Sequence, residues 1–357
     1  MCMSKMLFLP SIGSLLLLFW TCATNQTPES QLPDQPDVES DSLFLNPIHT
    51  HGPDPWVFQT EGQYFLTFTT GVNVTLYRSS EMSNLSGAFK KVIWTPPSTG
   101  PNSQNIWAPE IHRVHGKWYV YYAADDGNNE NHRMFVLENS HEDPMAGQWV
   151  DSGELKLPDN RWAIDGTIFE HEDQLYYLWS GWEGVTNIRQ NIYICKMSDP
   201  LTPTGKRVLL TSPELSWETN GVIPTVTEGP QMLKKDDRLF IVYSAGGCWT
   251  DGYTLGMLSA RKDADLMDPA SWEKSPQPVF IQNPEGNAFG PGHNGFFTSK
   301  DGTEDWIIYH ANGFAGQGCG NKRSARIQPF LWKDDGTPDF GQPHPLYQKL
   351  TKPSGEY

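Results

Sequence analysis

The sequence has few cysteines, few basic side chains and no apolar run long enough to cross a membrane as a helix. Its five cysteines include Cys195, Cys248 and Cys319, whose spacing is not that of a zinc site. Lysine and arginine number 26 against 42 aspartate and glutamate residues, which gives a formal net charge of −16. Because such a surface repels phosphate backbones, the composition excludes nucleic acid as a partner.

The longest apolar run lies at the N-terminus and matches the core of a signal peptide. It covers residues 7–20 and is shorter than a membrane span. Cys22 lies just beyond it, so residues 1–21 are predicted to be a lipoprotein-like signal peptide, with Cys22 lipidated. The bulky residues before Cys22 are unusual for such a signal, so plain secretion is the alternative. Residues 22–42 are rich in Pro, Ser and acidic side chains, as a flexible acidic linker would be.

These features predict an exported protein. We expect it to be lipid-anchored to a bacterial outer membrane, on the periplasmic side or at the surface, and otherwise secreted. The lipid anchor is the only membrane contact expected, and the chain is expected to be a monomer.

Aromatic residues, glycine and proline are abundant. Aromatics make up 12% of the chain, with 14 Trp, beside 32 Gly and 28 Pro. This composition suits strands and loops better than helices. The tryptophans fit a sugar-binding protein, because a sugar face packs well on an aromatic ring, but core packing is the alternative for most of them.

A pattern of one polar residue followed by a hairpin recurs five times at a spacing of roughly 60 residues. The second strands of these hairpins begin near Tyr64, Trp118, Leu175, Leu239 and Trp306. Further short strand candidates follow each hairpin, so each repeat can supply about four strands. The sequence therefore predicts an all-β fold, a five-bladed β-propeller with four-stranded blades over residues 43–357. A solenoid is the alternative.

The residue that precedes each hairpin is acidic in four repeats and a histidine in the fifth. These residues are Asp54, Glu110, Asp165, Glu228 and His293. The innermost strands of a propeller line its central channel, so the five side chains are expected to converge at one mouth. Converging carboxylates have pKa values that split, so one stays protonated while another is ionised. That pair is what two-carboxylate glycoside hydrolysis requires.

The motifs around these residues resemble those of glycoside hydrolase family 43, in order and in spacing. They are Asp54-Pro55, Trp107-Ala108-Pro109-Glu110, Ile164-Asp165-Gly166, Thr227-Glu228-Gly229-Pro230 and Gly292-His293-Asn294. The resemblance covers about residues 46–350. It implies a five-bladed propeller and hydrolysis with inversion at the anomeric carbon.

The resemblance also implies roles for three catalytic carboxyl groups. Asp54 matches the general base that activates water, and Glu228 matches the general acid that protonates the leaving oxygen. Asp165 matches the third acid, which orients Glu228 and tunes its pKa. Glu110 is expected to be structural or to lie beside the substrate.

Three further residues are candidates for substrate binding. Trp107 is expected to wall the sugar pocket, with core packing as the alternative. Arg326 matches a late arginine that contacts the sugar in relatives, with a surface strand position as the alternative. His293 matches the channel histidine of the family, which often lies near a bound cation, commonly Ca²⁺. A buried histidine without metal is equally expected, and the chemistry itself requires no cofactor.

Cys248 and Cys319 each follow an inner hairpin, and neighbouring blades bring such loops together. A disulfide between them is one hypothesis, and free thiols are the alternative. Cys195 lies in an apolar strand and is expected to be buried and free.

The resemblance favours release of terminal α-L-arabinofuranosyl residues from plant cell-wall polysaccharides of the arabinan or arabinoxylan type. The long loops at 125–133 and 182–190 favour exo action. A β-xylosidase or another exo-glycosidase of the family is the first alternative. A non-catalytic glycan-binding surface lipoprotein is the second, although a binder would not need the set of Asp54, Asp165 and Glu228.

Overall fold

The computed structural model describes residues 41–356, and these residues form almost exclusively β-structure. The predicted signal peptide, Cys22 and nearly all of the predicted linker lie outside the described residues. Within residues 41–356, no helix is both long and apolar enough to cross a membrane. The one α-helix described is α2 (Ser216–Thr219), a single turn.

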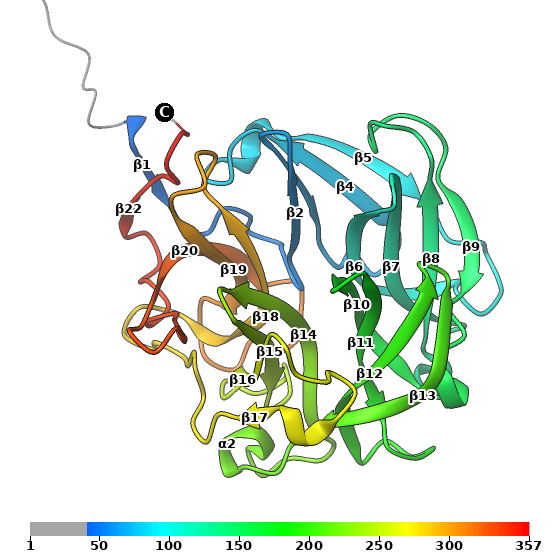
Figure 1. Cartoon of the computed structure of the whole chain (residues 1–357). Coiled ribbons are helices and arrows are strands. Elements are labelled where there is room, and N and C mark those ends of the chain that lie inside the picture. The colour runs from blue at the N-terminus through cyan, green and yellow to red at the C-terminus, as the bar shows by residue number, and fades with distance from the viewer. Residues whose placement is uncertain (1–40, 357) are drawn as a thin grey trace, which may run out of the picture. The chain divides into compact units, whose positions relative to one another are not determined.

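Five four-stranded antiparallel units follow one another along the chain, as the all-β propeller prediction requires (Figure 1). The first unit consists of β2 (Trp56–Thr60), β3 (Gln63–Thr67), β4 (Val74–Ser79) and β5 (Phe89–Trp94). The second consists of β6 (Gln104–Val114), β7 (Lys117–Asp125), β8 (Arg133–Asn139) and β9 (Val150–Glu154). The third consists of β10 (Ala163–His171), β11 (Gln174–Trp182), β12 (Arg189–Asp199) and β13 (Thr202–Thr211). The fourth unit consists of β14 (Thr225–Lys235), β15 (Arg238–Ala245), β16 (Thr254–Arg261) and β17 (Glu273–Lys274). The fifth consists of β18 (Phe289–Thr298), β19 (Asp305–Asn312), β20 (Ser324–Trp332) and β21 (Pro338–Asp339).

The first strands of the five units form a closed ring. In sequence order, β2, β6, β10, β14 and β18 each contact the next, and β18 contacts β2. A short parallel pairing of Arg189 and Gln190 with Thr225 and Val226 also joins the third unit to the fourth. The second strands begin within one residue of the positions predicted from the repeat, which confirms the hairpin assignment.

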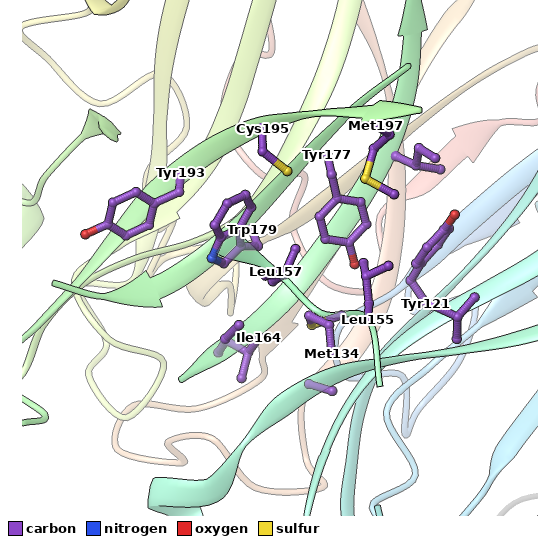
Figure 2. Close-up of a cluster of buried hydrophobic side chains, with 14 of the residues drawn as sticks. Tyr121, Met134, Leu155, Leu157, Ile164, Tyr177, Trp179, Tyr193, Cys195 and Met197 are labelled. Atoms are coloured by element: carbon purple, nitrogen blue, oxygen red, sulfur yellow. The ribbon is translucent and has the colours of Figure 1, made fainter. Parts of the chain in front are cut away.

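The core lies between successive units, where the flat faces of their sheets pack together. Each second strand is apolar and buried over most of its length, as β11 illustrates. Figure 2 shows one such cluster, in which Tyr121 from the second unit lies against Tyr177 from the third, with ring centroids 5.2 Å apart. Cys195 lies in the same cluster and is free and buried, as expected.

The two ends of the propeller domain meet beside the fifth unit. β1 (Leu43–Leu45) pairs antiparallel with β22 (Lys349–Thr351). The fully buried side chain of Asn46 then bonds the backbone of Ile327 twice, donating to its carbonyl at 2.8 Å and accepting from its N–H at 3.0 Å. The amide side chain thus acts as a further strand partner for β20, which ties the N-terminal segment to the last unit.

Four of the five inner strands carry a β-bulge near the same end of the ring. The register shifts after Trp107 in β6, Ile164 in β10, Glu228 in β14 and Gly292 in β18. In each case the following residue has a positive φ, and Asp54, two residues before β2, has the same backbone conformation. We call these five residues the apex residues: Asp54, Ala108, Asp165, Gly229 and His293. A bulge turns its side chains away from the ladder and leaves the apex unpaired.

Candidate active site

Because of the bulges, the five candidate residues do not occupy equivalent positions in their units, contrary to what the sequence had suggested. The five candidate residues were expected to precede their strands at one equivalent position, but only Asp54 precedes a strand. Asp165 and His293 share its position as apex residues, whereas Glu228 lies one residue before the apex Gly229. Glu110 lies two residues after the apex Ala108.

Three of the four acids line one pocket. Asp54, Asp165 and Glu228 face a cavity of about 500 Å³ at the bulged end of the ring, together with His293. Glu110 does not line this cavity. Its buried carboxylate accepts a hydrogen bond from Gln231 and lies 3.2 Å from Nε2 of His112. Glu110 is therefore part of the packing of the channel, as its structural assignment anticipated.

Asp54 is held as a buried carboxylate. The guanidinium of Arg323 donates to its Oδ1 at 2.6 Å, and Nδ1 of His293 lies 3.4 Å from the same oxygen. Burial raises the pKa of Asp54, but the charge of Arg323, together with the neighbouring His293 and His310, outweighs burial and holds the pKa well below its ordinary value. Asp54 is therefore ionised over the whole working range of pH and can accept a proton.

Glu228 and Asp165 have pKa values shifted in the opposite direction. Burial, reinforced by the charge on Asp54, raises the pKa of Glu228 to about 7. Burial and the neighbouring Glu228 carboxylate raise the pKa of Asp165 well above its ordinary value. The Gly229 N–H donates to Oδ2 of Asp165 at 3.1 Å, which favours the ionised form of Asp165 and limits the rise of its pKa.

Gly229 makes this arrangement sterically feasible. Its φ is +55°, and a Cβ at this position would lie 3.2 Å from Nδ1 of His293. A side chain here would strain the backbone and press on the histidine ring. The glycine after Glu228 therefore lets the bulge form and directs an N–H toward Asp165.

Tyr253 also holds Glu228. Its hydroxyl donates to Oε1 of Glu228 at 2.7 Å, and the tyrosine is fully buried. This bond favours the ionised form of Glu228 and thereby limits the rise of its pKa. Tyr253 begins the approach to β16, away from the inner strands, and the repeat pattern of the sequence gave no signal for it.

His293 lies among carboxylates but offers no cation site. Its Nδ1 is 3.4 Å from Oδ1 of Asp54 and 3.9 Å from Oδ2 of Asp165. Across residues 41–356, no group of three or more His, Cys, Asp or Glu side chains is arranged to hold a metal ion. The side chains around His293 therefore do not fit a directly bound Ca²⁺, and no chemical step is derived through one.

Trp107 lines the pocket as expected, and contacts on the side of its ring away from the pocket fix its position. Its ring stacks on His132, with centroids 4.1 Å apart, and His132 lies 2.9 Å from the buried carboxylate of Asp125. Trp162 lines the same wall and stacks on Trp182 at 5.0 Å. The pocket thus has a rigid aromatic side.

Arg326 does not line the pocket. Its guanidinium is fully buried in β20, where it donates to the Asn312 carbonyl at 3.2 Å and to Oγ of Ser324 at 3.3 Å. The arginine at the pocket is Arg323, three residues earlier. Arg323 lies directly before β20, whereas Arg326 lies within that strand. The prediction that Arg326 lies at the sugar site is therefore wrong, and the arginine that lines the pocket is Arg323.

The outer rim of the pocket is formed by the loops between second and third strands. Asn129 and Asn187, from the loops expected to close the cleft, line it. Cys248 and Cys319 form a disulfide that joins the loop after β15 to the loop after β19, and both cysteines line the rim. The exposed Trp249 stands beside this bond.

The chain matches known proteins over most of its length. The family described as Glycosyl hydrolases family 43 matches residues 44–338. The extracellular exo-α-(1→5)-L-arabinofuranosidase of Streptomyces avermitilis is 36% identical over 347 residues, which are 94% of this chain and 69% of that protein. An extracellular exo-α-(1→5)-L-arabinofuranosidase of Streptomyces chartreusis is 39% identical over 273 residues, which are 75% of this chain and 82% of that protein.

A solved structure agrees. The crystal structure of an α-L-arabinofuranosidase from Lactobacillus brevis superposes with a TM-score of 0.81 at 36% identity, covering 85% of this chain and 98% of that one. The motif resemblance, the ring of four-stranded units and the acid-lined pocket lead to the same assignment. The chain belongs to glycosyl hydrolases family 43.

Proposed function

We propose that this protein is an inverting exo-α-L-arabinofuranosidase, which releases terminal α-L-arabinofuranosyl residues from polysaccharides of the arabinan or arabinoxylan type. The observation that carries the proposal is a pair of carboxyl groups in one pocket whose pKa values are shifted in opposite directions. Asp54 is kept ionised by Arg323, and Glu228 is kept protonated to about neutral pH. The relatives named as exo-acting arabinofuranosidases support the choice of sugar and of exo action.

The mechanism uses these two groups on opposite sides of one glycosidic bond. The Asp54 carboxylate accepts a proton from water as the water oxygen attacks the anomeric carbon. Glu228 gives its proton to the leaving oxygen as the glycosidic bond breaks, so the sugar is released with inverted configuration. Asp165, bonded to the Gly229 N–H next to Glu228, orients the acid.

Substrate preference and stereochemistry test this proposal together. We expect rapid hydrolysis of 4-nitrophenyl α-L-arabinofuranoside and release of single arabinose units from α-1,5-linked oligosaccharides. Hydrolysis of the β-D-xyloside should be far slower. Proton NMR of the first product should show β-arabinose. Absence of release from arabinosides and from arabinan, or a first product with retained configuration, would refute the proposal.

The protein is exported, in agreement with the relatives that are named extracellular. For its final location we propose a lipid anchor on Cys22, supported by the apolar run of residues 7–20 before this cysteine. Replacing Cys22 with Ser should move the protein from the membrane fraction to the soluble fraction. An unchanged distribution would favour plain secretion. We also propose that the protein acts as a monomer, which light scattering would test.

A further inference from the structure

The backbone N–H of each apex residue needs a hydrogen-bond partner, because a bulge removes it from the strand ladder. In two units a hydroxyl of the preceding unit provides that partner. The Ala108 N–H donates to Oγ1 of Thr69, and the His293 N–H donates to Oγ of Ser244, both at 2.7 Å. Ser244 faces the residue before the bulge in its own unit, Glu228.

The apex that carries the predicted base has a different partner. The Asp54 N–H donates to Nδ1 of His310 at 3.1 Å. His310 pairs with Gly292, the residue before the bulge in the fifth unit, so it occupies the position that Ser244 has in the fourth. An imidazole ring therefore does for Asp54 what a hydroxyl does for the neighbouring apex residues.

An imidazole nitrogen can accept a hydrogen bond only when it carries no proton, and this restricts His310 to one form. Nδ1 is also 3.4 Å from Oδ1 of Asp54, but it cannot donate to that oxygen and accept the backbone N–H at once. The backbone N–H is always a donor. Nδ1 is therefore bare, and the ring proton is on Nε2, which has no hydrogen-bond partner among residues 41–356.

The surroundings of His310 favour this neutral form. The ring is almost fully buried and lies parallel to Tyr253, with centroids 5.6 Å apart and an interplanar angle of 6°. Burial, together with the positive charge of Arg323, lowers the pKa of His310 to about 3. The Tyr253 hydroxyl bonds Glu228, so the group that holds the acid stacks on the group that holds the base.

We propose that His310 is a positioning residue for the reaction, which fixes the carboxylate of Asp54 by accepting the Asp54 backbone N–H at a bare Nδ1. His310 does not line the substrate pocket, so it acts through the residues that it contacts, Asp54 and Tyr253. Asp54 has a φ of +52°, a conformation that a non-glycine residue keeps only when its surroundings hold it. The inference rests on the proposed function for its kinetic test, but not for its spectroscopic one.

Three substitutions separate the acceptor from the bulk of the ring. His310→Asn places an amide oxygen close to the position of Nδ1 and should keep kcat within about tenfold of the wild type. His310→Gln places its amide one bond further, and His310→Leu has no acceptor. Both should lower kcat by about 100-fold with KM within threefold, because a small displacement of a reacting group costs about that much.

A stability control excludes a purely structural explanation. Asn46→Ala removes two buried hydrogen bonds at Ile327, away from the pocket, and should lower the melting temperature while kcat stays at the wild-type value. His310→Leu should lower kcat even when its melting temperature is as high as that of Asn46→Ala, which keeps the wild-type kcat. Equal kcat for the Leu variant and the wild type, or an Asn variant no better than the Gln variant, would overturn the proposal.

Nitrogen NMR of histidine-labelled protein tests the geometry without any substrate. The two ring nitrogens of His310, assigned by their loss in His310→Asn, should show a bare Nδ1 and a protonated Nε2 from neutral pH down to about pH 5. A protonated Nδ1 would overturn the proposal. A bare Nδ1 in a protein that cleaves no arabinofuranoside would support the hydrogen bond and count against the proposed function alone.

Discussion

At the scale of single residues, the active site depends on unequal treatment of two buried carboxyl groups. Arg323 contacts Asp54 at 2.6 Å and, together with the neighbouring His293 and His310, reverses the effect of burial on its pKa. Among residues 41–356, no arginine forms an ion pair with Glu228, which instead receives a tyrosine hydroxyl, so burial and the charge on Asp54 dominate there. One base and one acid thus coexist at neutral pH within one cavity.

Neutralising either carboxyl group should therefore abolish most of the activity. Asp54→Asn removes the group that accepts the proton of water, and Glu228→Gln removes the proton donor. Each should lower kcat on 4-nitrophenyl α-L-arabinofuranoside by about 10²–10⁴-fold. Glu110→Gln is the matched control because Glu110 is buried outside the pocket, and it should cost far less. A near-wild-type rate in either pocket variant would refute its assigned role.

The alkaline limit of activity should report Glu228. Its carboxyl group must be protonated, so activity should fall as the pH rises through about 7. Asp54 stays ionised, so the acid limit should lie well below pH 4. Tyr253→Phe removes a donor that favours ionised Glu228, and the alkaline limit should move upward by about one unit, the equivalent of one hydrogen bond to a charged group.

The control for this shift is Tyr309→Phe. Tyr309 is equally buried, but its hydroxyl bonds Gln328 away from the pocket, so the profile should not move. A downward shift in Tyr253→Phe, or equal shifts in the two variants, would contradict the role given to Tyr253.

At the scale of elements, one bulge repeated on the inner strands explains the site. An unbroken strand would turn neighbouring side chains to opposite faces. The register shift instead lets the residue before the apex and the apex itself both face the cavity, as Ile164 and Asp165 do in β10. In β14 the same two positions are Glu228 and Gly229, which puts the acid one residue earlier than the other polar groups.

Part of this geometry could be predicted from the sequence. The repeat of hairpins predicted the units, and the acids beside the inner strands predicted Asp54, Asp165 and Glu228 as pocket residues. The sequence carried no sign of the bulges, so Glu110 was aligned with residues that it does not match. Arg323 and Arg326 are close in sequence, and only the pairing of β20 decides which one reaches Asp54.

Tyr253 and His310 were missed for a related reason. His310 lies in a second strand and Tyr253 directly before a third strand, and polar residues at such places have no common spacing from the inner-strand motifs. A histidine within the apolar stretch of β19 was a signal in principle, because a buried imidazole needs a partner. Its partner is 256 positions away in sequence, at Asp54, and only the closed ring brings the two together.

The disulfide between the rim loops should matter for both stability and activity. It closes a loop of 71 residues, and its removal in a Cys248→Ser, Cys319→Ser variant should cost about 2–4 kcal/mol of unfolding free energy. Arg323 follows Cys319 closely, and Trp249 follows Cys248, so looser loops should also lower activity on oligosaccharides several-fold. Denaturant unfolding and initial rates measure the two effects.

Reductant provides the control. It should reproduce both losses in the wild type and change nothing further in the double-serine variant, because Cys195 is buried and free. Full activity and stability in the reduced wild type would show that the rim does not depend on the bond.

At the scale of the whole molecule, the chain must close a ring whose first and last units are far apart in sequence. The contact between β18 and β2 completes the ring of inner strands. Outside it, the pairing of β1 with β22 and the double bond of Asn46 to Ile327 attach the N-terminal segment to the last unit. The carboxylate of Glu356 also accepts the N–H groups of Met82 and Ser83, which links the C-terminus to the first unit.

Asn46→Ala tests the strength of this closure. The substitution leaves a buried N–H and a buried carbonyl of Ile327 without partners, at about 1–3 kcal/mol for each group. For a domain of this size the melting temperature should fall by roughly 5–10 °C. Asn131→Ala, at an exposed amide that bonds only Asp126, should shift it by less than about 2 °C.

In the Asn46→Ala variant, catalytic activity should respond differently from stability. Ile327 belongs to β20 but does not line the pocket, so kcat at 25 °C should stay unchanged while the stability falls. If the loss of Asn46 lowered kcat as strongly as the loss of His310, the ring would transmit strain from its closure to Asp54, and the positions of base and acid would depend on the whole circle. An unchanged kcat would instead show that the base is held locally, by the contacts of Arg323 and His310 with Asp54.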